Sequence, residues 1–171
     1  MRDVNDDEVV DLARFGRDRG IGMRFIEFMP LDAQGAWTEA QVVPAREIIE
    51  RIGAVFPLEP VSAAHAEPAA RWRYVDRRGD VGVIPSVTEP FCENCDRVRI
   101  TAEGQFRTCL FGLDETDLRA ELRTEHGLDA PDLDDRLAVA IEGAVGNKWA
   151  GHHIGKVDFV RPNRSMSQIG G

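Results

Sequence analysis

Three cysteines, all within 18 residues of one another, restrict how this part of the chain can fold. Their spacing is Cys92-x2-Cys95-x13-Cys109. Two cysteines three positions apart can direct both sulfurs at one ion when the backbone between them turns tightly, and a third on the far strand of a hairpin can close the site. Three thiolates leave one position open, for histidine or water on zinc, or as one unliganded iron on a four-iron cluster. The pattern therefore predicts a metal site on Cys92, Cys95 and Cys109.

Two other interpretations of the cysteines start from the same residues. Cysteine outside a disulfide is often a small core side chain, but Cys92 and Cys95 lie in a polar loop with Glu93, Asn94 and Asp96, which disfavours burial. A zinc-stabilised, non-catalytic binding module would need one histidine besides the three cysteines, and the spacing alone fits zinc as well as iron–sulfur. An auxiliary electron-transfer cluster of another radical enzyme would also show similar spacing. The histidines that could serve as the fourth zinc ligand are His65, His126, His152 and His153.

Arginines stand next to the predicted metal site. Arg97 and Arg99 follow Cys95, and Arg107 lies on the expected return strand. If Cys95 begins a strand, Arg97 and Arg99 share the face that Cys95 uses. Guanidinium groups beside an open metal position would bind an anion such as phosphate or carboxylate. Solvated arginines on an exposed hairpin are the simpler interpretation, and the coincidence with the cysteines favours binding.

Composition excludes several classes of protein. The chain of 171 residues has 21 basic and 30 acidic residues, a formal charge of −9, which disfavours DNA or RNA as a partner. A local arginine cluster can still bind a small anion. No apolar run approaches the ~18 residues of a membrane helix, and the first residues lack the apolar core of a signal peptide. We expect a soluble, cytoplasmic domain without a membrane partner and without a disulfide framework.

Local patterns predict an α/β layout followed by hairpins and helices. Apolar spacing predicts a first helix that Asn5 or Asp6 caps and Gly20 ends. A short, mostly apolar strand that ends at Pro30 follows this helix, and this order indicates the end of a βα-type unit with a parallel sheet. Pro44 suits the first turn of the next helix. We expect a strand at 23–29, a helix at 45–52, an irregular segment at 57–70, hairpins at 71–76 with 81–85 and 98–101 with 105–110, helices near 115–125 and 132–144, and a polar tail from 146.

Three blocks of the sequence resemble one family. The run PFCENCDRVR at 90–99, continued through Gly104 to CLF at 109–111, resembles the second cluster motif of the molybdenum cofactor biosynthesis protein A family, the radical-SAM GTP 3′,8-cyclases. The segment 20–30, with RFIEFMP at its end, is similar to a late barrel strand of that family. The C-terminal MSQIGG is similar to its Gly-Gly tail, so the resemblance extends in order from about Val4 to Gly171.

This resemblance implies an α/β fold, the C-terminal part of an incomplete (β/α) radical-SAM barrel followed by a hairpin-and-helix lid domain that carries an iron–sulfur cluster. Residues 1–56 would be the last βα elements of a truncated barrel, and residues 57–171 the cluster- and GTP-binding domain with the Gly-Gly tail. The family's first cluster needs a Cys-x3-Cys-x2-Cys motif, which this sequence lacks. We therefore expect a fragment, an internal start, or a chain whose N-terminal half is supplied elsewhere, and no activity without that half.

The resemblance also implies a lyase activity, the cyclisation of GTP to 3′,8-cyclo-7,8-dihydro-GTP. In the family, a first [4Fe-4S] cluster and S-adenosylmethionine, both dependent on the N-terminal half, generate a 5′-deoxyadenosyl radical. That radical removes hydrogen from the ribose C3′ of GTP, and C3′ then attacks C8 of guanine. The implied partners are GTP, a second copy of the chain in a homodimer, and a downstream cyclic pyranopterin monophosphate synthase.

Individual residues receive roles from the same resemblance. A second [4Fe-4S] cluster, on the three cysteines, would present its open iron to the guanine ring. Arginines would bind GTP, and the two terminal glycines would enter the active site. The implied ligands of the cluster are Cys92, Cys95 and Cys109, the GTP-binding residues are Arg24, Arg97 and Arg99, and the tail residues are Gly170 and Gly171.

Overall fold

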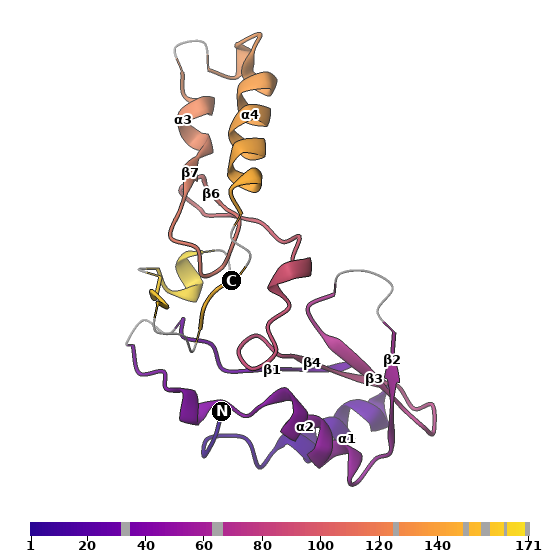
Figure 1. Cartoon of the computed structure of the whole chain (residues 1–171). Coiled ribbons are helices and arrows are strands. Elements are labelled where there is room, and N and C mark those ends of the chain that lie inside the picture. Colours follow the sequence, from indigo (N-terminus) through magenta and orange to yellow (C-terminus); the bar gives the residue numbers. More distant parts are fainter. Residues whose placement is uncertain are drawn as a thin grey trace. The chain divides into compact units, whose positions relative to one another are not determined.

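The computed structural model describes residues 1–31, 35–62, 67–124, 127–148, 151–154, 158–162 and 164–169. Contacts divide the chain into two units (Figure 1). The first unit contains Met1–Pro30 and Ala36–Cys95, and the second contains Leu31–Gly35 and Asp96–Gly171. Cys92 and Cys95 therefore belong to the first unit, whereas Cys109 belongs to the second.

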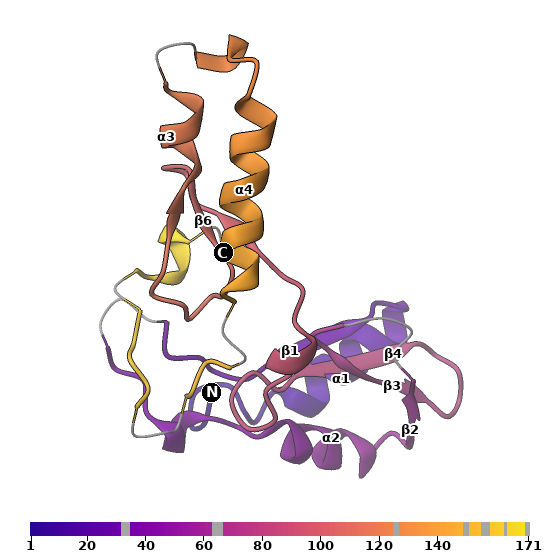
Figure 2. The same cartoon turned by 45° about the horizontal axis from the view of Figure 1, so that its top comes forward.

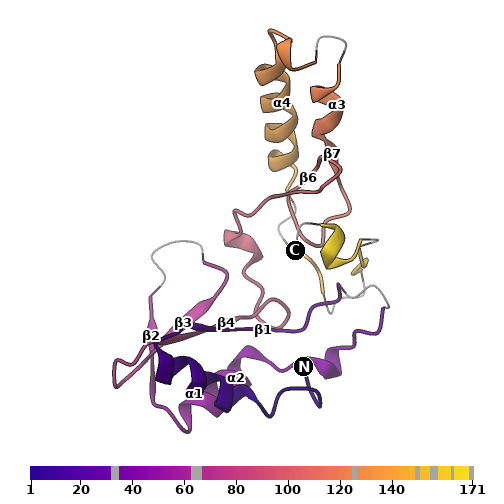
Figure 3. The ribbon, with the colours of Figure 1, turned by 180° about the vertical axis from the view of Figure 1, so that it is seen from behind.

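The first unit is a four-stranded mixed sheet with two helices on one of its faces, as Figure 3 shows from behind. The strand order is β1-β4-β3-β2, in which β1 runs parallel to β4 and the other neighbours are antiparallel. Strands β1 and β2 therefore form the two edges of the sheet. The elements are α1 (Val9–Arg19), β1 (Met23–Ile26), α2 (Ala45–Gly53), β2 (Leu58–Val61), β3 (Ala70–Tyr74) and β4 (Asp80–Ile84).

Alternation along the strands separates an apolar face from a polar one. Val81 and Val83 of β4 are fully buried and pack in one cluster with side chains of α1 and α2, including Ala13 and Ile52. Because successive strand residues point to opposite faces, Gly82 lies on the face without helices. On that same polar face, Arg24 of β1 and Arg71 of β3 flank Gly82 in the strand register.

Of the two ends of α1, only the C-terminal end agrees with the prediction from the sequence. Gly20 closes the helix in the left-handed conformation with φ of 68°, as expected. The predicted cap by Asn5 or Asp6 is wrong, because Glu8 occupies the N-cap position and no side chain caps the helix. Asp6 instead lies beside Arg51 at 3.3 Å, and Asn5 accepts a hydrogen bond from the terminal amine of Met1. Both candidate caps are thus engaged in other contacts.

The segment 57–70 was expected to be irregular, and this expectation is wrong for its first part. Residues Leu58–Val61 form β2, which pairs antiparallel with β3. The expected hairpin of β3 with β4 and the helix α2 are confirmed. The strand at 23–29 is shorter than expected and ends at Ile26. His65 lies outside the described residues.

The second unit combines a small antiparallel sheet with a pair of helices. Figure 2 shows α3 and α4 side by side, and Arg136 of α4 joins them by donating to the Glu121 carboxylate of α3 at 3.1 Å. The expected hairpin at 98–110 and both expected helices are confirmed. The elements are β5 (Arg99–Ile100), β6 (Gln105–Arg107), β7 (Thr116–Asp117), α3 (Leu118–Leu122) and α4 (Leu133–Gly146), with 3-10 helices η1 (Glu39–Gln41), η2 (Cys92–Asn94), η3 (Gly127–Asp129) and η4 (Met166–Gln168).

The chain is thus a mixed α/β protein, as the sequence indicated. The division at residue 56 into a barrel remnant and a lid concerns the architecture of a larger enzyme and stays a prediction. Within the described ranges, we find no helix with the length and apolar character needed to span a membrane.

Candidate functional site

The first two cysteines lie on a tight backbone turn. Cys92 begins η2 and Cys95 follows it, and the Cys95 amide donates to the Cys92 carbonyl at 3.2 Å. A second bond, from the Asn94 amide to the Phe91 carbonyl at 3.3 Å, tightens the same turn. Both cysteines are half-buried thiols outside any disulfide. This is the local conformation that the Cys-x2-Cys spacing requires for two sulfurs on one metal.

Cys109 lies in the second unit, two residues after the end of β6. Its sulfur accepts a hydrogen bond from the Phe111 amide at 3.4 Å, and its carbonyl accepts one from the Gly112 amide at 3.2 Å. These two bonds fix the conformation of the loop around the Cys109 sulfur. The loop 109–112 therefore already presents one donor to the predicted ligand.

Arg107 supports this loop from β6. Its side chain is buried, with 3% exposure, and donates to the Gly112 carbonyl and the Glu115 carboxylate. Arg164 also contacts the Glu115 carboxylate, at 2.8 Å. The sequence places Arg107 on the return strand of the hairpin, and the structure confirms this position at the end of β6. The structure shows it in a buried ion pair that braces the Cys109 loop.

Within the described part of the chain, no group of three or more His, Cys, Asp or Glu side chains could hold a metal ion. The donor chemistry does fit iron or zinc, because three thiols outside disulfides are soft ligands of the kind both metals accept. The site on Cys92, Cys95 and Cys109 thus stays a prediction.

The two histidines that the structure describes make other contacts. His152 Nδ1 accepts a hydrogen bond from the Ile154 amide at 3.1 Å, and its ring lies 5.0 Å from the Phe111 ring. His153 Nδ1 is 2.6 Å from the Asp158 carboxylate. His65 and His126 lie outside the described residues.

Arg24 lies on the polar face of the first unit. Its Nη1 donates to the Asp80 carboxylate at 3.2 Å and to the Met23 carbonyl at 3.0 Å. A Cβ at Gly82 would lie 2.7 Å from the Arg24 Cδ, and one at Gly22 would lie 2.8 Å from an Asp80 oxygen. The two glycines therefore leave the space in which the Arg24–Asp80 pair sits.

Arg97 and Arg99 lie at the start of the second unit. Strand β5 begins at Arg99, within the expected strand 98–101, so Arg97 precedes it and the condition that a strand starts at Cys95 is not met. The Arg97 carbonyl accepts a hydrogen bond from the Lys148 ammonium at 3.0 Å. Arg99 is half-buried opposite Arg107 in the β5–β6 register. The tail residues Gly170 and Gly171 lie outside the described residues.

Glu27 is a buried polar residue whose role sequence reasoning missed. Its side chain is 2% exposed, and its carboxylate accepts hydrogen bonds from the Ala45, Val87 and Thr88 amides and from the Thr88 hydroxyl. The available signal was an acidic residue within the apolar run 23–29. A buried carboxylate is costly unless it is hydrogen-bonded or paired, so this position merits a role.

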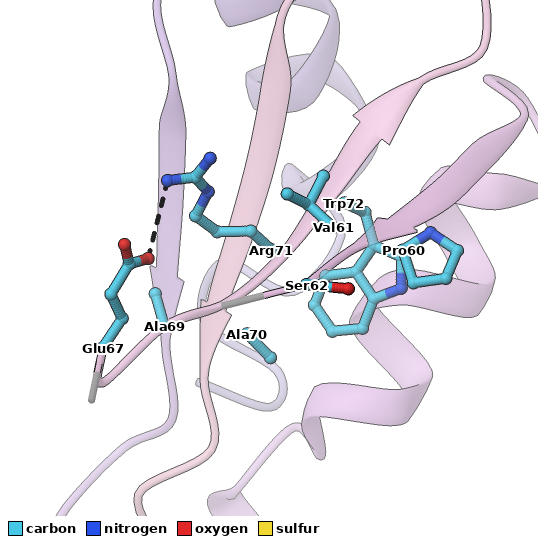
Figure 4. Close-up of a pocket in the computed structure, with 8 residues that line it drawn as sticks. All are labelled: Pro60, Val61, Ser62, Glu67, Ala69, Ala70, Arg71 and Trp72. Carbon is cyan, nitrogen blue, oxygen red and sulfur yellow. Dashed lines mark ion pairs between the residues drawn. The ribbon is translucent and has the colours of Figure 1, made fainter. Parts of the chain in front are cut away.

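A small cavity of about 230 Å³ lies at the ends of β2 and β3 in the first unit (Figure 4). An ion pair between Arg71 and Glu67, 3.5 Å apart, stands at one side, and Trp72 packs beside Pro60 on the other. None of the residues predicted for the site lines this cavity. Its lining is Pro60, Val61, Ser62, Glu67, Ala69, Ala70, Arg71 and Trp72.

Comparison with known proteins shows the family to which the chain belongs. Residues 21–154 match the family described as Molybdenum Cofactor Synthesis C. The chain belongs to this family, and the resemblance noted in the sequence is confirmed.

The names of individual relatives are more specific than the description of the family. The chain is 44% identical over 173 residues to the GTP 3′,8-cyclase of Streptomyces coelicolor, a match that covers 100% of this chain and 49% of that protein. It is 41% identical over 177 residues to the GTP 3′,8-cyclase of Corynebacterium glutamicum, covering 100% and 45%. It is 43% identical over 170 residues to GTP 3′,8-cyclase 2 of Mycobacterium tuberculosis, covering 96% and 46%. The chain thus spans about half the length of these three relatives. Shorter matches to GTP 3′,8-cyclases of Synechococcus cover 35% and 37% of those proteins.

Proposed function

We propose that this chain forms the substrate-side part of a GTP 3′,8-cyclase that acts in molybdenum cofactor biosynthesis. The observation that carries the proposal is the family match over residues 21–154, which includes all three cysteines and the arginines Arg24, Arg97 and Arg99. The names of the relatives supply the reaction. They do not favour the alternative of a non-catalytic zinc module.

The three cysteines would hold the second [4Fe-4S] cluster. The η2 turn brings Cys92 and Cys95 onto one short segment, and the Phe111 amide donates to the Cys109 sulfur. When bound, a cluster with three protein ligands supplies an open iron, a Lewis acid for a purine nitrogen or oxygen. The residues around the loops would limit how the guanine ring can lie against it.

The arginines would bind the triphosphate of GTP. Guanidinium groups make paired hydrogen bonds to phosphate oxygens, and fixing the triphosphate also fixes the ribose. Asp80 keeps the Arg24 guanidinium in one orientation. Gly170 and Gly171, having no side chains, would enter a crowded cavity that a Cβ would block.

The remaining parts of the proposal concern the larger enzyme, a radical-SAM lyase. Residues 1–56 would close an incomplete barrel, and residues 57–171 would form the lid domain. All three cysteines are used by one cluster, so the cluster that binds S-adenosylmethionine would come from an N-terminal half without which this chain is inactive. We also propose a cytoplasmic homodimer whose product passes to a cyclic pyranopterin monophosphate synthase.

Anaerobic reconstitution tests the cluster. The chain should take up about four iron and four sulfide per polypeptide, and a variant with Cys92, Cys95 and Cys109 all replaced by serine should take up neither. Substitution of any one of the four histidines by alanine should leave the iron content unchanged, at His65, His126, His152 or His153. A chain that binds zinc without sulfide, and loses it in one histidine variant, would contradict the proposal in favour of the zinc module.

A second measurement tests the dependence on an N-terminal half. The reconstituted chain, mixed with S-adenosylmethionine, GTP and a reductant, should form no 5′-deoxyadenosine. Turnover by the chain alone would contradict this part of the proposal.

A further inference from the structure

The Glu27 carboxylate lies where three segments of the first unit meet. It follows the last residue of β1, and its own amide continues the parallel ladder by donating to the Ile84 carbonyl at 3.2 Å. Oε1 accepts from the Ala45 amide at 2.8 Å and the Thr88 hydroxyl at 2.5 Å. Oε2 accepts from the Val87 and Thr88 amides at 2.7 and 2.8 Å. One side chain therefore receives four short hydrogen bonds.

The donor from Ala45 belongs to the beginning of α2. Ala45 is the first residue of this nine-residue helix, and the first amides of a helix have no partner within it. A carboxylate there satisfies one such amide and interacts favourably with the positive end of the helix dipole. In the described part of the chain, Glu27 takes part in no ion pair, so amides and the helix end stabilise its charge.

The other donors belong to the segment that leads to the cysteines. Val87 and Thr88 lie five and four positions before Cys92. Pro85 and Ser86 are buried, whereas residues 88–90 are exposed, so the chain leaves the protein interior where Glu27 holds it. Four residues span at most about 14 Å, and Pro90 stiffens that span further. Fixing Thr88 therefore restricts where Cys92 can lie.

We infer that Glu27 is a positioning residue for the cysteine pair. Its carboxylate ties the segment before Cys92 to the start of α2 and the end of β1, and so presents the Cys92–Cys95 turn in one place. This inference rests on the proposed function, since it concerns cysteines that hold a cluster. It assigns Glu27 a part in the site although the residue touches neither metal nor substrate.

Glutamine is the informative substitution. A glutamine side chain has almost the same size but offers only one acceptor oxygen, and its NH2 group would face two of the four donors. In either orientation of the amide, one end of the link between the segment 87–88 and the start of α2 loses its acceptor, so Glu27→Gln should loosen this link while the sheet remains. Thr88→Val removes only the hydroxyl donor from an exposed residue and should give a smaller effect of the same kind.

Tyr74→Phe is the matched control. Tyr74 is 1% exposed and donates from its hydroxyl to the Ala13 carbonyl at 3.2 Å, in the core that α1 shares with the sheet. The control thus loses one buried hydrogen bond of the first unit without touching the segment before Cys92. Any effect of general destabilisation should appear in it as well.

The experiment compares the reconstituted parent chain with Glu27→Gln, Thr88→Val and Tyr74→Phe. The measurements are the thermal midpoint, the rate of iron loss to a chelator, and the EPR spectrum of the reduced cluster. Loss of a residue that orients metal ligands typically weakens metal retention 10–100-fold, so we expect Glu27→Gln to lose iron about tenfold faster or more and to show a changed EPR spectrum. Tyr74→Phe should lower the midpoint and keep the parent rate and spectrum.

The outcomes separate this inference from the proposed function. A Glu27→Gln chain whose rate and spectrum match those of Tyr74→Phe overturns the positioning role and leaves the cluster proposal intact. A parent chain that takes up no iron and sulfide overturns the proposed function and this inference with it. If Glu27→Gln does not fold, Thr88→Val decides, because parent-like iron loss and spectrum in that variant overturn the inference.

Discussion

On the polar face of the sheet, the side chain of Arg24 occupies the space that a side chain at position 82 would fill. A Cβ there would lie 2.7 Å from the Arg24 Cδ and 3.0 Å from its Nε, much closer than normal contact distances. Arg24 is also tied to Asp80, so its side chain is held at both its middle and its end. The position of the Arg24 side chain thus depends on glycine at position 82.

We predict that Gly82→Ala displaces Arg24 and weakens GTP binding to the iron-loaded chain about tenfold, which equals about 1.4 kcal/mol. Arg24 is 37% exposed in its side chain and can move outward, so the fold should persist. Isothermal titration with GTP measures the change. Gly143→Ala is the control, since nothing lies within 4 Å of a Cβ there, and it should bind GTP like the parent. Unchanged affinity in Gly82→Ala would show that the Arg24 position is not needed.

The role of Glu27 shows what a sequence conceals at this scale. The Cys-x2-Cys spacing predicted a tight turn because the relevant contacts lie within three residues, and the η2 turn confirms it. Glu27 accepts hydrogen bonds from residues 18 and 60 positions away. No local pattern links such positions, because only the folded sheet brings Ala45 and Val87 to the same carboxylate.

Among the elements, those with strong local signals were predicted and one without them was missed. The helix after Pro44 and the β3–β4 hairpin follow from capping residues, apolar spacing and a turn sequence. Strand β2 contains Pro60 and lies in a segment rich in proline, alanine and serine, a composition typical of irregular structure. A strand at the edge of a sheet tolerates proline, because its outer amides need no partner in the ladder. Its edge position depends on the order of strands, which is a tertiary property.

The hairpin of β5 and β6 depends on Gly104 in two ways. Gly104 has a φ of +83°, and a Cβ there would lie 2.8 Å from the Arg119 Cβ in α3. Its amide donates to the Thr101 carbonyl, and its carbonyl accepts from the Leu118 amide at the start of α3. The turn of the hairpin therefore also packs against the start of α3 and forms a hydrogen bond with it.

We predict that Gly104→Ala destabilises the chain by about 2–3 kcal/mol, from left-handed backbone strain of about 1–2 kcal/mol and the contact with Arg119. Urea unfolding monitored by circular dichroism measures it. Gly20→Ala separates the two causes, because Gly20 has a left-handed φ of +68° with nothing within 4 Å of a Cβ. It should show the strain alone, and an equal loss in both variants would argue against the contact with α3.

For the whole molecule, lowering the pH has two opposite effects on folding stability. The formal charge is −9 at pH 7, so mild acidification relieves repulsion between carboxylates. In the first unit, however, hydrogen bonding and charge attraction from Arg2 hold the pKa of Glu47 below its usual range, and Arg51 lies 2.5 Å from the same carboxylate. A carboxyl group whose pKa is lower in the folded state binds protons more readily when unfolded.

Folding stability from Glu47 is therefore present above its unfolded pKa and is lost as the pH falls through its folded pKa. We predict that urea midpoints fall as the pH drops below the usual range of a glutamate pKa, and that Glu47→Gln reduces this slope while lowering the midpoint at pH 7. Glu50→Gln is the control, since Glu50 is 69% exposed and forms only a surface pair with Arg46. A Glu47→Gln chain with the parent's pH dependence would contradict the assignment.

Three of the four bonds to Glu27 come from main-chain amides, and this has a consequence for how such sequences can diverge. Every residue except proline offers an amide, so exchanges at positions 45 and 87 leave the anchor intact as long as the new side chains fit. Selection on the cysteine loop would then concentrate on the single carboxylate. Proline at position 87 would be the informative exception. It would leave the side chain uncharged and apolar, yet it would remove one of the hydrogen bonds to the Glu27 carboxylate.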